Sequence, residues 1–64
     1  MTFFCFLESA NSSVPHMEPL DAESLEEARQ QAKRLLSRHT QAMSARIYLD
    51  AEEVDVLARS AIGP

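Results

Sequence analysis

Three side chains in this sequence belong to types that carry out nucleophilic or metal chemistry, namely Cys5, His16 and His39. A cysteine assisted by a histidine can act as a nucleophile, provided that its surroundings lower the pKa of the thiol. Cys5 instead lies within the apolar run of residues 3–7, with no basic residue close to it in the sequence. Cysteine in such a run usually packs as a small hydrophobic side chain. We therefore expect Cys5 to be a core residue.

The two histidines could bind a metal ion together. Ligand sets that can be read from a sequence have short, regular spacings, and neither His16 nor His39 has a second histidine or a carboxylate at helical ligand spacing. His39 ends a predicted helix, where an imidazole can interact with free main-chain carbonyls. His16 follows Pro15 on an extended segment. We therefore expect no metal site and no cofactor.

A local run of carboxylates offers the remaining candidates for acid–base chemistry. Most of them lie in a loop or at the start of a helix, where negative charge is stabilised in any case. The run comprises Glu18, Asp21, Glu23, Glu26 and Glu27. The single glycine, Gly63, excludes a glycine-rich phosphate loop. We expect no catalytic residues and predict that the protein is not an enzyme.

The length of 64 residues predicts a single small domain, residues 1–64, close to the lower limit of independent folding. Small domains compensate for their limited core with disulfides, metals or oligomerisation. One cysteine excludes an intramolecular disulfide. Oligomerisation or unusually good packing must then supply the stability. We predict a homo-oligomer, most simply a homodimer, or a chain with a protein partner.

The formal net charge of −4 argues against nonspecific binding to nucleic acid or to an anionic membrane. No apolar run approaches the roughly 20 residues that a membrane span requires. The apolar N-terminal run is too short for a signal peptide and lacks a preceding basic segment. These features predict a cytoplasmic protein, and we expect it to be bacterial.

The elements that must position these side chains begin with a strand over residues 3–7, which is apolar on both sides. Residues 14–22 carry Pro15 and Pro19, so this segment is predicted to be an edge strand or an extended arm. One of its sides carries His16, Glu18 and Leu20, and the other carries Met17 and Pro19.

A helix is predicted from Leu25 to His39. Ser24 and Glu27 fit a capping box, in which each side chain would accept a hydrogen bond from the other residue's main-chain N–H. An apolar stripe at steps of three and four consists of Leu25, Ala28, Ala32, Leu35, Leu36 and His39. The alanines of this stripe predict a close approach to a flat partner such as a sheet.

Residues 40–44 are predicted to form a connector, and residues 45–50 alternate as a half-buried strand. The following segment fits two structures. As a strand it would form a hairpin with its predecessor, although the turn lacks the glycine or asparagine that tight hairpins prefer. As a short second helix it would start at Asp50, with Glu53 as capping partner. We favour the hairpin.

The pattern predicts an α+β fold in the order β-β-α-β-β, with an antiparallel sheet of about four strands and one amphipathic helix on one face. A crossover of the helix over the first strand gives the strand order 2-1-3-4. This order places residues 3–7 in the centre and the proline-bearing strand at an edge.

The phenylalanine-rich first strand, the helix opening L-E-E-A-R-Q-Q-A (residues 25–32) and the closing ARIYLDAEEVDVL resemble an uncharacterised family of small alphaproteobacterial proteins. Members of that family begin with a Tyr-Phe-Phe-like strand and contain a Leu-Glu-Glu-Ala-Arg helix of similar length. The resemblance implies a fold and no chemistry.

One helix can cover only one face of the sheet. Phe3, Cys5 and Leu7 are assigned to the covered side, which leaves Phe4 and Phe6 on the other. Tyr48 and Arg46 of the third strand point outward as well. The predicted interface therefore consists of Phe4, Phe6, Tyr48 and Arg46.

We predict that this patch is a protein–protein surface of a non-enzymatic accessory or regulatory module, most simply a homodimer. The alternative is a stacking platform for single-stranded nucleic acid, which requires a basic surround. Only Arg46 is basic near the patch, so nucleic acid is the less favoured partner. If the last segment were a helix, it could bury the patch within one chain.

Overall fold

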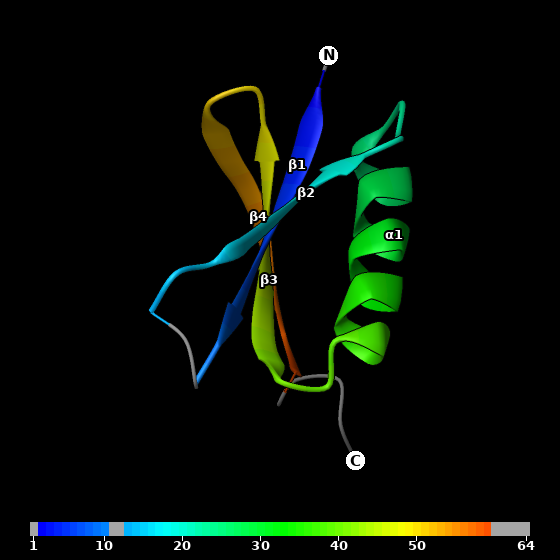
Figure 1. The fold of residues 1–64 in the computed structure, drawn as a ribbon. Coiled ribbons are helices and arrows are strands. Elements are labelled where there is room, and N and C mark those ends of the chain that lie inside the picture. Colours follow the sequence, from blue (N-terminus) through cyan, green and yellow to red (C-terminus); the bar gives the residue numbers. More distant parts are fainter. Residues whose placement is uncertain (1, 11–12, 60–64) are drawn as a thin grey trace.

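The computed structural model describes residues 2–10 and 13–59. Its elements are β1 (Phe3–Ser9), β2 (His16–Leu20), α1 (Leu25–Arg38), β3 (Ala42–Leu49) and β4 (Glu52–Ala58). The four strands form one antiparallel sheet in the order β2-β1-β3-β4. The helix lies along one face of this sheet (Figure 1). The predicted fold class and strand order are thus confirmed, and the alternative of a second helix after β3 is wrong.

Strand β1 occupies the centre of the sheet, which explains why its sequence is apolar on both sides. Cys5 pairs with Glu18 of β2 on one side and with Ile47 of β3 on the other. The odd-numbered residues Phe3, Cys5 and Leu7 are buried beneath the helix, whereas Phe4 and Phe6 are half-buried on the opposite face.

The core lies between the sheet and the helix. Ala28 and Ala32 are fully buried there, as predicted for a helix that closely approaches a flat sheet, but Leu25 of the predicted stripe remains 38% exposed. The buried hydrophobic residues form one cluster: Phe3, Cys5, Leu7, Leu20, Ala28, Ala32, Leu36, Ala42, Ala45 and Ile47.

The start of α1 is capped largely as the sequence predicts. The Ser24 hydroxyl accepts a hydrogen bond from the N–H of Glu27 at 3.2 Å. The Glu27 carboxylate accepts from the N–H of Glu23 at 2.9 Å, one residue before the predicted partner Ser24. Further along, the Gln31 amide pairs with the main chain of Asp21, at 2.6 and 3.1 Å, and so ties the β2–α1 connection to the helix.

The helix ends one residue earlier than predicted, at Arg38, and His39 is its C-cap. The N–H of His39 donates to the Leu35 carbonyl at 2.9 Å. The guanidinium of Arg59, just after β4, donates to the carbonyls of Leu36, His39 and Ala42. Arg59 therefore satisfies helix-end carbonyls that would otherwise lack a partner.

Strand β3 begins at Ala42, so the predicted connector over residues 40–44 is too long. Glu8 pairs with Ser44, and the register then skips Met43 of β3, so that Ser9 pairs with Ala42. Ala42 is 3% exposed. The strand therefore begins three residues before residue 45, its predicted start.

The hairpin between β3 and β4 forms without glycine. Asp50 takes the left-handed conformation instead, with φ of 56°. Aspartate tolerates this region better than most residues because its short side chain can bond locally. A second irregularity, opposite Ile47 and Tyr48, interrupts the regular alternation of β4. Val54 packs against the core, whereas Val56 pairs with Arg46 and lies on the opposite face of the sheet.

No helix within residues 2–10 and 13–59 is long and apolar enough to cross a membrane.

Candidate functional site

The face of the sheet opposite α1 carries aromatic and apolar side chains from all four strands. We call it the open face and define it by Phe4, Phe6, Met17, Arg46, Tyr48 and Val56. The strand register aligns them, together with Pro19 and Glu53, in two rows across the sheet. One row is Met17, Phe6, Arg46 and Val56, and the other is Pro19, Phe4, Tyr48 and Glu53.

Phe4, Phe6 and Tyr48 form the aromatic centre of the open face, in which two of the rings are in contact. The rings of Phe6 and Tyr48 meet edge to face, with centroids 5.2 Å apart and planes inclined at 68°. This geometry is favoured by the ring quadrupoles. Beside it lies an open hollow lined by Phe4, Phe6, Met17, Tyr48, Asp50 and Ala51. The centre therefore presents apolar surface in a defined shape.

A network of charges borders this centre. The Arg46 guanidinium donates to the carboxylates of Glu8 and Glu53, each at 2.9 Å. The Ser44 hydroxyl also donates to Glu8, at 3.1 Å. The hydrogen bond from Arg46 is the main reason that the pKa of Glu8 lies below its usual value, and the bond from Ser44 is the second. The bonds that Arg46 donates to Glu8 and Glu53 raise the pKa of Arg46. Arg46, the cation of this border, is thus already paired with two carboxylates.

The structure brings together all four residues that the sequence assigns to an interface: Phe4, Phe6, Arg46 and Tyr48. It adds Met17 and Val56, whose exposed fractions are 47% and 41%. Alternation in the second strand already separates Met17 from the buried Leu20. No pattern reveals Val56, because its side depends on the irregularity between β3 and β4.

Cys5 is a core residue, in agreement with the expectation from its apolar surroundings. It is free and 0% exposed. Desolvation by burial, with the charge of Glu18 as a smaller cause, raises the pKa of the Cys5 thiol to about 11. The reactive thiolate is therefore scarce at neutral pH.

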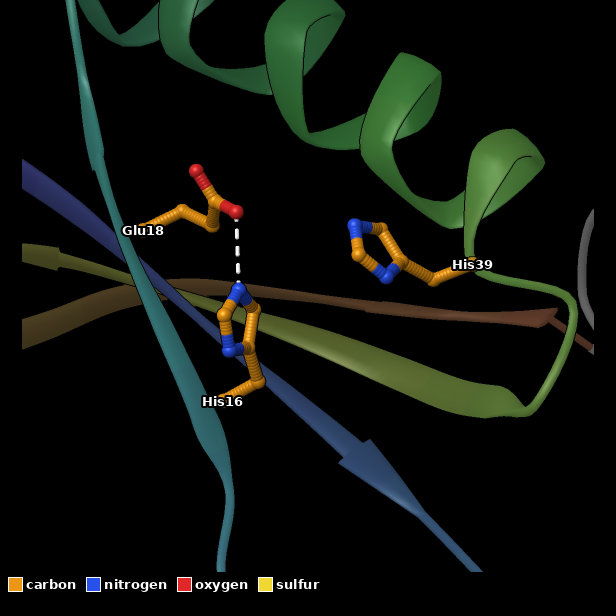
Figure 2. A group of neighbouring side chains, drawn as sticks. All are labelled: His16, Glu18 and His39. Carbon is orange, nitrogen blue, oxygen red and sulfur yellow. Dashed lines mark hydrogen bonds and ion pairs between the residues drawn. The ribbon is translucent and has the colours of Figure 1, made fainter.

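The two histidines, which are far apart in the sequence, lie close together in the fold. His16 Nε2 and Glu18 Oε2 are 2.8 Å apart. The ring centroids of His16 and His39 are 5.5 Å apart. One ligand atom from each of the three residues lies within 4.8 Å of the others. We call this group the His16–Glu18–His39 cluster (Figure 2).

Nothing in local sequence spacing predicts this cluster. Strand alternation places His16 and Glu18 on the same side of β2, but only the packing of α1 against the sheet brings His39 to them. Of the other candidate carboxylates, that of Glu27 has a defined local role, because it caps the helix by accepting from the N–H of Glu23.

Comparison of the chain with protein-family models, with curated proteins and with solved structures gives no match in any of the three. The predicted resemblance to the alphaproteobacterial family stays a prediction.

Proposed function

We propose that this protein is a small non-enzymatic module that forms a homodimer by packing the open faces of two copies against each other, in an accessory or regulatory role. The observation that carries the proposal is the aromatic centre of Phe4, Phe6 and Tyr48, which no described element of the chain covers. A small domain with a thin core gains stability by burying such a surface in a second copy.

The border of the open face supports a second copy as the partner. Arg46 is flanked by Glu8 and Glu53, so the surface carries both charge signs around an apolar centre. A two-fold interface presents the same surface from both subunits, and such a surface must complement itself. Mixed charges at the rim allow this, because two copies of such a rim meet with less repulsion than two rims of a single charge sign.

Pairing of sheet edges is the weaker route to a dimer. On the β2 edge, Pro19 lacks the N–H that a further strand would need. On the β4 edge, Glu52, Glu53 and Asp55 make the strand acidic, and charged edge strands disfavour pairing with a further strand. We therefore place the contact on the face of the sheet.

The nucleic-acid alternative receives less support. The aromatic rings would suit base stacking, but a backbone-binding groove requires free cations. Arg46 is bound to two carboxylates. The net charge of −4 adds a general repulsion toward phosphates.

The proposal also includes the absence of catalysis and a cytoplasmic location. Cys5, the strongest nucleophile by residue type, is buried with a raised thiol pKa. A free thiol persists most readily in a reducing compartment.

Sedimentation velocity over the micromolar range tests the dimer. We expect the mass of two chains for the natural sequence and of one chain for Phe6→Arg and Tyr48→Arg, with circular dichroism verifying that each variant is folded. Leu25→Arg is the matched control, because Leu25 is exposed on α1, which covers the other face. A natural chain that sediments as a monomer throughout contradicts the proposal. Binding of a labelled single-stranded oligonucleotide at low salt would favour the alternative.

A further inference from the structure

We infer that the His16–Glu18–His39 cluster is a binding site for one divalent transition-metal ion of the Zn²⁺ type, located where β2 meets the C-terminal end of α1. This site is separate from the open face, because His16 and Glu18 lie on the helix side of β2. His16 pairs with Leu7, and Glu18 pairs with Cys5, both of which are buried beneath α1.

The backbones of the three metal-ligating residues are fixed by hydrogen bonds in the absence of an ion. His16 and Glu18 are alternate residues of β2 and are fixed by its pairing with β1. Three hydrogen bonds to its own N–H and carbonyl fix the backbone of His39. Its N–H donates to Leu35, and its carbonyl accepts from the N–H of Ala42 at 2.9 Å and from Arg59 at 2.9 Å. The side chains therefore converge from rigid supports, which limits the entropy lost on binding.

The distances suit an ion after small side-chain rotations. Bond lengths of about 2.0–2.1 Å imply a separation of about 3.3 Å between the ligand atoms of a tetrahedral zinc ion. His16 Nε2 and Glu18 Oε2, at 2.8 Å, are closer than this, and the widest separation in the cluster lies within 4.8 Å. Figure 2 shows the His39 ring opposite the His16–Glu18 pair, with a space between them.

The donor types select the class of ion. Two imidazoles and one carboxylate suit Zn²⁺ and similar transition metals, whereas Mg²⁺ and Ca²⁺ prefer oxygen donors alone. Three protein ligands leave a fourth position for water or for a group from a partner. The side chains of His16 and Glu18 are 58% and 35% exposed, so an ion can enter without opening the fold.

A calorimetric titration of the tag-free chain with zinc tests the site. We expect one ion per chain, and we expect each of His16→Gln, Glu18→Gln and His39→Gln to weaken binding by about tenfold or more. Glu26→Gln is the matched control, because it removes an exposed carboxylate from the first turn of α1 and leaves the cluster intact. Its affinity should equal that of the natural chain.

Two further measurements keep the test decisive if a variant fails to fold. His16 and His39 are the only histidines of the chain, so both sets of imidazole NMR signals should shift when zinc binds the natural protein. Light scattering on the same samples should show that zinc leaves the number of chains per particle unchanged. Absence of binding at millimolar zinc, a shift of only one imidazole, or half an ion per chain would each overturn the inference. None of these outcomes depends on whether the open face forms a dimer.

Discussion

The guanidinium of Arg59, just after β4, donates a hydrogen bond of 2.9 Å to the carbonyl of His39, which caps α1. The same guanidinium reaches the carbonyls of Leu36 and Ala42. One side chain therefore joins the end of the last strand to the helix end and to the start of β3. It also holds the main chain of a residue in the proposed metal site.

Replacing Arg59 with methionine should destabilise the protein, because it leaves the partly buried carbonyls of Leu36, His39 and Ala42 without this donor. Hydrogen bonds to charged groups are typically worth about 1.5–3 kcal/mol, and we expect a loss in this range. Urea unfolding followed by circular dichroism measures it. Arg34→Met, on the exposed side of α1, is the control and should change the free energy of unfolding little. Equal stability of the two variants would contradict the assigned role.

The turn between β3 and β4 should depend strongly on the residue at position 50. Asp50 has φ of 56°, a conformation that β-branched residues adopt only at high cost. Asp50→Val should therefore lose about 1–2 kcal/mol, whereas Asp50→Gly should retain the stability of the natural chain. Thermal unfolding provides the comparison. Ala51→Val, the neighbouring change at ordinary φ, should be the milder of the two valine variants.

Glu8 should make the stability of the fold sensitive to acid. Its pKa is lower in the folded protein than in the unfolded chain because Arg46 and Ser44 donate hydrogen bonds to the carboxylate. The unfolded chain thus takes up the proton first as the pH falls, so the stabilisation is complete above the unfolded-state pKa and disappears as the pH falls through the folded-state pKa. Glu8→Gln should show a smaller loss of stability than the natural chain over this acidic range in urea titrations. Glu26→Gln serves as the control, and an identical acid profile for all three proteins would refute the expectation.

Cys5 should produce the opposite trend in alkali. Burial, with a smaller effect of the Glu18 charge, raises its folded-state pKa from the ordinary value of 9.0 to about 11. The unfolded chain loses the thiol proton first, so stability falls as the pH rises from about 9 toward 11. Cys5→Ala removes this contribution and should flatten that part of the profile. At neutral pH, a thiol-specific reagent should label Cys5 only at the rate at which the chain opens, and urea should accelerate labelling. Rapid labelling of the folded chain would contradict the buried position.

The fold was predictable to a large extent because its signals are local. The capped amphipathic helix, the prolines of β2 and the apolar first strand each follow from residue type and spacing. Together with a helix that crosses over the first strand, they predict a central β1 and a strand order of 2-1-3-4, which the structure confirms. The boundaries were less predictable, since the start of β3 depends on how Ser9 pairs with Ala42.

The candidate sites divide in the same way. Alternation placed Phe4 and Phe6 on one face of the first strand, and Glu8 on the same side indicated that this face lies opposite the helix. Tertiary structure decided the side of Val56, through an irregular strand pairing that leaves no local pattern. It also decided that His39 meets His16 and Glu18, because this contact joins residues more than twenty positions apart through the packing of α1 on the sheet. Local periodicity indicates which residues share a face of a regular strand, whereas irregular pairing and packing determine which distant residues meet.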